Sequence, residues 1–166
     1  MTVDSYKWLP PSLKGFFANM QIETPAEIPW APLARPLSEA RIALVTTAGI
    51  NVRGIEPPFD YEREQTNPGW GDPTYRVLPR DLRQEQVQSG HLHINNDDID
   101  ADFNVAFPIS RMLELEAAGV IGSLAPTNYS FMGYQPDTTE WRERYAPEVA
   151  QRMKDERVDG VLLTPV

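Results

Sequence analysis

Apolar runs separated by polar, glycine-rich and proline-rich stretches predict an alternation of strands and helices along this chain. Residues 41–47 form a continuous apolar run that ends in small residues before Gly49, which is typical of a strand buried on both faces. Residues 103–107 are a further apolar stretch. Additional strands are predicted at residues 75–79, 86–94, 120–125 and 161–166.

Helical spacing of apolar residues follows two of these segments. Pro108 opens a helix that Gly119 ends, and one face of it is apolar through Ile109, Met112, Leu113 and Ala117. A sequence similar to a capping box at residues 137–140, together with Pro147, predicts a second helix before Asp159. Its inward-facing residues are predicted to be Val149, Met153 and Val158. Strands that alternate with helices predict an α/β fold, with a mainly parallel sheet flanked by helices in a Rossmann-like three-layer arrangement.

Proline-rich segments define the rest of the predicted organisation. Residues 1–36 are expected to form an N-terminal arm with room for one short helix at residues 12–20. Its aromatic residues are expected to pin it to the domain or to a partner subunit: Tyr6, Trp8, Phe16, Phe17 and Trp30. Residues 37–166 are predicted to form the α/β domain, with long loops at 49–73 and 126–136. The final segment 161–166 has the character of a strand that leads into a loop, so this domain is expected to be incomplete at its C-terminus.

Composition narrows the classes of function. The chain has 166 residues, of which 41% are hydrophobic and 23% charged, as in an ordinary globular domain. Its net charge of -9 makes nucleic acid and anionic membrane surfaces poor partners, because neutralising phosphates requires clustered Lys and Arg. The absence of cysteine excludes disulfides and any thiol mechanism by this polypeptide alone. No apolar run approaches the length of a membrane span, so a cytoplasmic protein is expected.

The two histidines of the chain are its first candidates for catalysis. On a strand, His91 and His93 would share one face, where two imidazoles could act as acid and base, bind substrate or ligate a metal. Asp98 is the favoured partner among the acidic residues that follow, together with Asp102 one helical turn later. These acids could equally form a solvated turn.

A second set of candidates could bind a substrate. Arg76 could clamp a substrate carboxylate, or it could form a structural pair with Asp72. The other candidate substrate-binding residues carry hydroxyl groups and are placed near predicted strand ends, where small-molecule pockets of parallel sheets form. They are Thr46, Thr47, Ser123, Tyr129, Ser130 and Thr164.

Several of these segments, taken in order, resemble one known family. They are ALVTTAG at 43–49, GDPTYRVLP at 71–79, residues 91–102 followed by NVAFP at 104–108, GVIGSLAP at 119–126 and YSFMG at 129–133. Together they look like the selenoprotein B family of the glycine, sarcosine, betaine and D-proline reductases. The resemblance runs from about residue 37 to residue 166.

This resemblance implies reductive cleavage of a carbon–nitrogen bond in a small amino acid or amine. The nucleophile would be a selenocysteine or cysteine that becomes oxidised and is regenerated by an external thiol or thioredoxin-type reductant. In such proteins it comes immediately after the strand that corresponds to residues 161–166, so it is expected to follow Val166. A homo-oligomer or a partner subunit is expected, because the last strand would leave an unfinished sheet flank. The alternatives are a non-catalytic binding or assembly subunit, and a metal-dependent hydrolase built on His91, His93 and Asp98.

Overall fold

The computed structural model describes residues 7, 9–11, 14–15, 19, 27 and 31–166. The chain divides into two units, Met1–Pro32 and Leu33–Val166, and the second contains the sheet and its helices. Most of the helix predicted at residues 12–20, and all five aromatic residues of the predicted arm, lie outside the described residues. The predicted boundary after residue 36 stays a prediction.

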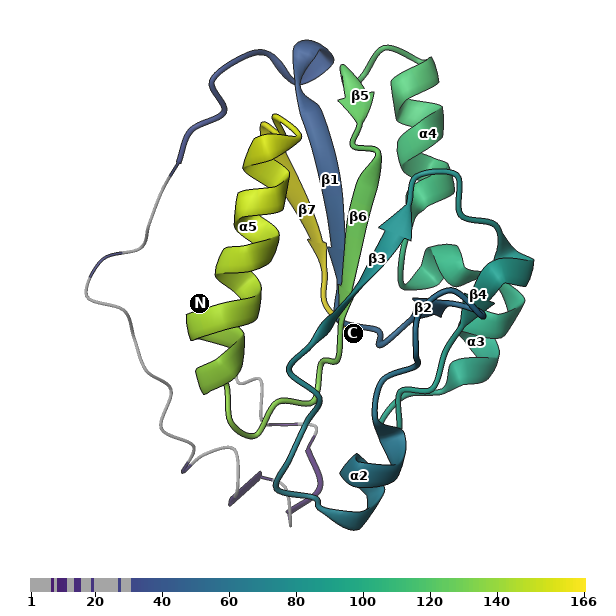
Figure 1. Ribbon diagram of the computed structural model, residues 1–166, viewed down its shortest axis with the longest axis vertical. Coiled ribbons are helices and arrows are strands. Elements are labelled where there is room, and N and C mark those ends of the chain that lie inside the picture. Colours follow the sequence, from purple (N-terminus) through teal and green to yellow (C-terminus); the bar gives the residue numbers. More distant parts are fainter. Residues whose placement is uncertain (1–6, 8, 12–13, 16–18, 20–26, 28–30) are drawn as a thin grey trace. The chain divides into compact units, whose positions relative to one another are not determined.

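Within the described residues, five strands form one mixed, mostly parallel sheet (Figure 1). The strand β1 (Arg41–Thr46) is central: it is parallel to β7 (Gly160–Thr164) on one side, and to β5 (Ser123–Leu124) and β6 (Thr127–Phe131) on the other. The strand β3 (Tyr75–Pro79) lies antiparallel to β6 at the far edge. The predicted α/β class with a mainly parallel sheet is therefore confirmed.

Alternating residues of β1 pack against different helices. Ile42 and Leu44 belong to the core cluster of α4 (Ile109–Ala117), whereas Ala43 belongs to the cluster of α5 (Ala146–Asp155). Because successive side chains of a strand point to opposite faces, the two helices cover opposite faces of the sheet (Figure 1). Both helices were predicted from their apolar spacing. Gly119, with φ of +69°, follows α4 at its C-terminus, and the π-helical turn Trp141–Tyr145 precedes α5.

The strand predictions hold only in part. The predicted loop at residues 126–136 contains β6, which pairs with both β1 and β3, and the predicted loop at 49–73 contains β2 (Asn51–Val52) and α2 (Tyr61–Thr66). Of the predicted strand at 86–94 only β4 (Val87–Gln88) forms, antiparallel to β2. His91 and His93 therefore do not lie on a strand. They precede α3 (Asn96–Ala101), in a turn.

The predicted last strand forms as β7 and pairs with β1 along one edge. Its side chains from Val161 to Leu163 are exposed. Within the described part of the chain, none of the helices has the length and apolar character needed to span a membrane.

The side chain of Asn128 bridges a break in the backbone hydrogen bonding between β1 and the segment formed by β5 and β6. Ile42 of β1 pairs with Leu124 of β5, and Val45 of β1 pairs with Tyr129 of β6. Between these two pairs, the segment that runs from β5 into β6 has two more residues than β1. The buried Asn128 side chain takes the place of the lost backbone pairing: its Oδ1 accepts from the backbone N–H of Leu44 at 2.8 Å. Its Nδ2 donates to the carbonyl of Ala125 at 3.3 Å.

Replacing Asn128 with Ala is expected to lower the free energy of unfolding by about 2 kcal/mol, because a buried N–H and a buried carbonyl lose their partner. Urea-induced unfolding followed by circular dichroism measures the change. Gln151→Ala is the control, since this exposed α5 side chain bonds only to Asp155 of its own helix, and its effect should stay within about 0.5 kcal/mol. Equal midpoints for Asn128→Ala and the original chain would contradict the assigned role.

Candidate active site

The loops that follow three parallel strands meet at one end of the sheet. Thr47, directly after β1, holds the segment after β7: its Oγ1 accepts from the N–H of Val166 at 2.9 Å and donates to the Val166 carbonyl at 3.3 Å. The buried Thr46 donates its hydroxyl to the carbonyl of Ala106 at 2.8 Å. Thr164 lies beside them and donates to the carbonyl of Val45. The structure thus brings together three of the candidate hydroxyl residues.

Gly133, two residues after β6, marks the point where these loops converge with His91. A Cβ atom at Gly133 would lie 2.9 Å from the carbonyl oxygen of Val166, 3.0 Å from that of Thr47 and 3.3 Å from Nε2 of His91. Contacts this short leave no room for a side chain. The absence of a side chain at Gly133 therefore allows the end of β7 and the imidazole of His91 to lie close together.

His91 is a buried imidazole with one free ring nitrogen. Only 3% of the residue is exposed, and its Nδ1 accepts from the backbone N–H of His93 at 3.1 Å. In the neutral ring Nε2 then carries the hydrogen, and among the described residues Nε2 has no hydrogen-bond partner. Burial, with a smaller contribution from His93, lowers the pKa of His91. His91 is therefore a neutral imidazole whose Nε2–H lies beside Gly133, where the loop after β7 also arrives.

His93 is paired with a carboxylate that the sequence analysis did not single out. Its Nε2 lies 3.1 Å from Oε1 of Glu64, whose side chain is only 2% exposed, whereas the His93 side chain is 50% exposed. Burial raises the pKa of Glu64, and the nearby His93 opposes this shift. Glu64 lies on α2, in a segment predicted to be a loop, so no helical periodicity was available to place it inward.

Arg76 and Asp72 form the structural pair that the sequence left open. Their closest charged atoms are 3.6 Å apart, and both side chains are more than nine-tenths buried. The Arg76 guanidinium also donates to four oxygen atoms and lies 4.1 Å from the centre of the Phe59 ring. The acceptors are the carbonyls of Pro57, Pro58 and Tyr75 and the hydroxyl of Thr74. Four of its five N–H groups are thereby hydrogen-bonded, and Nη2 also lies near the Asp72 carboxylate, which favours a structural role over a substrate clamp.

The remaining candidates lie apart from this point. Asp98 is exposed on α3, and Asp102 caps the N–H of Asn104. Ser123 accepts from Arg41 at the opposite end of β1, because its strand is followed directly by β6. Among the described residues, no group of three or more histidines and acids is arranged to hold a metal ion. The set of His91, His93 and Asp98 is thus not assembled.

Two further candidates on β6 are occupied in the fold. The buried Ser130 accepts from the backbone N–H of Ile50 at 3.0 Å. The buried Tyr129 packs in the core cluster of α5, with its ring 5.8 Å from that of Tyr75. Both residues therefore support the sheet.

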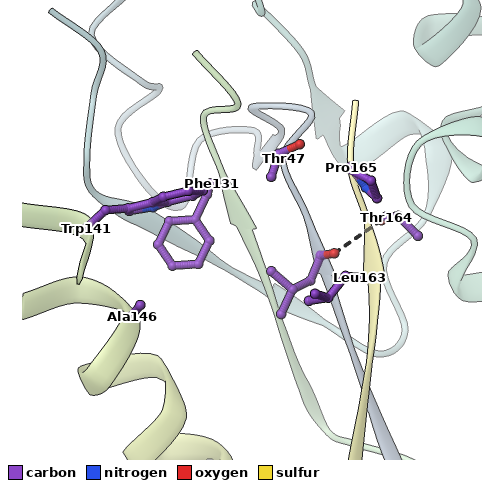
Figure 2. A pocket seen from close by; sticks show the side chains of 8 residues that line it. Thr47, Phe131, Trp141, Ala146, Leu163, Thr164 and Pro165 are labelled. Atoms are coloured by element: carbon purple, nitrogen blue, oxygen red, sulfur yellow. Dashed lines mark hydrogen bonds between the residues drawn. The ribbon is translucent and has the colours of Figure 1, made fainter. Parts of the chain in front are cut away.

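An apolar cavity of about 300 Å³ lies beside the end of β7 (Figure 2). Phe131 and Trp141 line one side of it, with their ring centres 5.2 Å apart, and Leu163, Thr164 and Pro165 line the other. Val45, Thr47 and Ala146 complete it. The aromatic wall was not predicted, because Trp141 comes from a polar helix start. Thr47 joins this cavity to the point where His91 and Val166 meet.

The fold and this site define an α/β protein whose loops converge at the carboxyl ends of parallel strands, as in many small-molecule enzymes. The sequence pattern of the glycine/sarcosine/betaine reductase selenoprotein B family matches residues 12–166. The chain belongs to this family. No solved structure matches it.

Curated relatives carry related names. The chain is 33% identical over 152 residues to the D-proline reductase subunit gamma of Acetoanaerobium sticklandii, covering 92% of the chain and 59% of the relative. It is 34% identical over 137 residues to the glycine reductase complex component B subunit gamma of Symbiobacterium thermophilum, with 82% and 31% covered. A betaine reductase complex component B subunit beta of Peptoclostridium acidaminophilum is 34% identical over 137 residues, with 81% and 29% covered. The chain thus spans less than two thirds of the length of these relatives, which are subunits of reductase complexes.

The lowered pKa of His91 predicts a pH dependence of stability. The unfolded chain binds a proton at His91 below about pH 6.5 and the folded chain resists doing so, so stability is lost as the pH falls below 6.5 and is unaffected above it. His91→Gln should remove the contribution of His91 to the slope of the unfolding free energy against pH. For one proton this contribution approaches about 1.4 kcal/mol per pH unit. Urea titrations between pH 5 and pH 8 measure the difference. Leu92→Gln, an exposed neighbour without a titrating group, should keep the original slope, and a slope unchanged in His91→Gln would refute the prediction.

Proposed function

We propose that this chain forms most of the catalytic site of a reductase that cleaves a carbon–nitrogen bond in a small amino acid or amine. The nucleophile would be a selenocysteine or cysteine following Val166 in the complete gene product. The observation that carries this proposal is the convergence of the Val166 carbonyl and Nε2 of His91 at Gly133. In the family, the reactive residue comes directly after the strand that corresponds to β7.

The chemistry requires a stabilised chalcogen anion and a source of protons. His91, neutral and buried, would donate its Nε2–H to the selenolate or thiolate, and such a bond to an anion is stronger than one between neutral groups. His93, half exposed, can exchange protons with water and would supply the proton that the leaving nitrogen takes up. The side chains lining the apolar cavity beside Thr47 and Pro165 carry no charge, so the cavity would hold the uncharged body of the substrate.

The overall reaction balances with an external thiol. The carbon–nitrogen bond breaks and takes up two electrons and two protons, which yields one new C–H and one new N–H bond. Two thiol groups supply them and become a disulfide. The proposed substrates are proline, glycine or betaine, after the names of the relatives, and the reductant is a dithiol or a thioredoxin-type protein.

The nucleotides after the Val166 codon, with mass spectrometry of the native protein, test the position of the nucleophile. The expected result is a selenocysteine or cysteine codon followed by a reading frame with α/β character. An ordinary stop codon with no such frame downstream would reject the proposal.

Turnover by the complete protein tests the chemistry. With dithiothreitol and D-proline, glycine or betaine, we expect formation of the reduced product, lost when the selenocysteine or cysteine is replaced with Ser. His91→Gln should lower kcat about 100-fold, as expected for a lost catalytic hydrogen-bonding or proton-transfer group. Glu62→Gln, an exposed change on α2, should leave kcat unaltered. Thiol-dependent turnover that survives the Ser replacement would contradict the proposed nucleophile.

A second candidate function, as an assembly subunit, is favoured by the free edge of β7. Among the described residues this edge has no partner strand, and Val161 and Leu163 on one face and Leu162 on the other are exposed, Leu163 by 66%. An exposed apolar edge strand is a template for pairing with a strand of another polypeptide. Such an assembly subunit would bind its partner without catalysing reduction.

Leu163→Lys is expected to weaken assembly, because it places a charge where a partner strand would pack. Sedimentation velocity should show a native assembly larger than one chain and a shift of Leu163→Lys toward the monomer. Val120→Lys, an exposed apolar position away from β7, should leave the assembly unchanged. A native protein that is monomeric at all concentrations and inert toward the reductase subunits of its own organism would exclude this role.

A further inference from the structure

Glu64 is a buried carboxylate with a single side-chain partner. Its Oε1 lies 3.1 Å from Nε2 of His93 in a close charge contact, and within the described residues neither of its carboxylate oxygens has a partner with hydrogen-bond geometry. The nearby carboxylate of Asp72 also raises the pKa of Glu64, because it disfavours a second negative charge beside it. Burying a carboxylate usually costs several kcal/mol that one ion pair does not fully offset. A contribution to stability alone therefore does not explain why a carboxylate is buried at position 64.

The helix α2 holds Glu64 in a fixed position. Asp60 caps α2 by accepting from the N–H of Arg63 at 3.0 Å, and the N–H of Asp60 donates to the buried Asp72 at 3.0 Å. Tyr61, in the first turn, donates its hydroxyl to the carbonyl of Gly49 in the loop after β1. The carboxylate is thus tied to the same loops that form the candidate site.

The ring of His93 is held between two groups. Glu64 contacts its Nε2, and Tyr134 lies against the ring with their centres 4.4 Å apart. Tyr134 is itself fixed, because its hydroxyl donates to the carbonyl of Pro68 at 2.6 Å. A Cβ at Gly71 would lie only 1.9 Å from the Tyr134 carbonyl, so the two backbones are in close contact there.

The backbone of His93 then determines the state of His91. Its N–H donates to Nδ1 of His91 at 3.1 Å, which leaves the hydrogen of the neutral ring on Nε2. Asn96 holds the carbonyl of His91 at 2.8 Å, which fixes the His91 backbone without touching the ring. The ring orientation therefore depends on the His93 contact.

We propose that Glu64 is a positioning residue for His91: by holding the ring of His93 it keeps the His93 N–H on Nδ1 of His91, so that Nε2–H faces the end of β7. The inference rests on the proposed function in that His91 and His93 are the proton donors used there, and the tautomer of His91 can be measured without turnover. Glu64 acts through His93 and touches neither substrate nor nucleophile.

Nitrogen-15 NMR of the histidine rings in the full chain tests the proposal, because the sequence contains only two histidines. In the original chain at pH 7.5, His91 should show one protonated Nε2 and one unprotonated Nδ1. In Glu64→Ala this single tautomer should be replaced by a mixture. Glu64→Gln should restore it, since the amide has nearly the same size and keeps an oxygen atom beside Nε2 of His93. Glu62→Ala, which removes an exposed glutamate of the same helix, should leave the spectrum unchanged.

His93→Ala is the second variant. It leaves the Glu64 side chain in place, so it creates no cavity at that buried position. His91 is then the only histidine, and loss of its single tautomer is expected because the anchored ring is gone while the backbone N–H remains. A single Nε2–H tautomer that persists in both Glu64→Ala and His93→Ala would overturn the proposal. The same change in Glu62→Ala would overturn it too, since the effect would then not belong to the buried carboxylate.

Kinetics separate this inference from the proposed reductase. In the complete protein, Glu64→Ala should lower kcat about tenfold, less than the loss expected for His91→Gln, with substantial recovery in Glu64→Gln. If the protein proves inert toward every substrate while the His91 tautomer still depends on Glu64, the proposed function fails and the positioning role stands. If turnover is present but Glu64→Ala changes neither kcat nor the tautomer, the positioning role fails alone.

Discussion

The backbone pairing of β1 on both of its edges is the constraint on which the rest of the structure depends. One edge pairs with β7 from Ile42 to Thr46, and the other with β5 and then β6. Since β6 and β7 are both parallel to β1, the loops that follow these three strands arrive at the same end of the sheet. Asn128 keeps the second edge closed where two additional residues interrupt the register. The meeting of Thr47, Gly133 and Val166 is a consequence of this pairing.

The sequence predicted those elements whose apolar periodicity is strong. The strand β1 and the helices α4 and α5 each bury a regular set of side chains, so a pattern of spacing was sufficient to locate them. The strand β6 was assigned to a loop because Thr127, Asn128 and Ser130 are polar. Their polar groups are satisfied inside the fold, Asn128 by the backbone of β1 and Ser130 by the N–H of Ile50. Side-chain hydrogen bonds between segments far apart in the chain leave no local signal.

The sequence predicted the candidate site, like the fold, only in part. Hydroxyl residues at the ends of β1 and β7 follow from the rule for parallel strands, and the structure brings Thr46, Thr47 and Thr164 together. His91 was found because histidines are rare in this chain, although the reason given, a shared strand face, was wrong. Glu64 and Trp141 were missed, since each becomes important only when a distant segment packs against it. Arg76 shows the converse: a residue type suited to binding a carboxylate is instead hydrogen-bonded to the carbonyls of Pro57 and Pro58, which lie in an earlier segment of the chain.

Leu163 belongs both to the exposed edge of β7 and to the lining of the apolar cavity. Leu163 lines the cavity opposite Phe131 and Trp141, and it is also the most exposed of the β7 side chains. Any strand or helix that packs on β7 from the side of α5 would therefore cover Leu163 and narrow the opening of the cavity. Excluding water at that position strengthens the hydrogen bond that the neutral His91 can donate, because electrostatic interactions are stronger in a less polar environment. If both proposals hold, association at the edge of the sheet would therefore strengthen the chemistry proposed for its end.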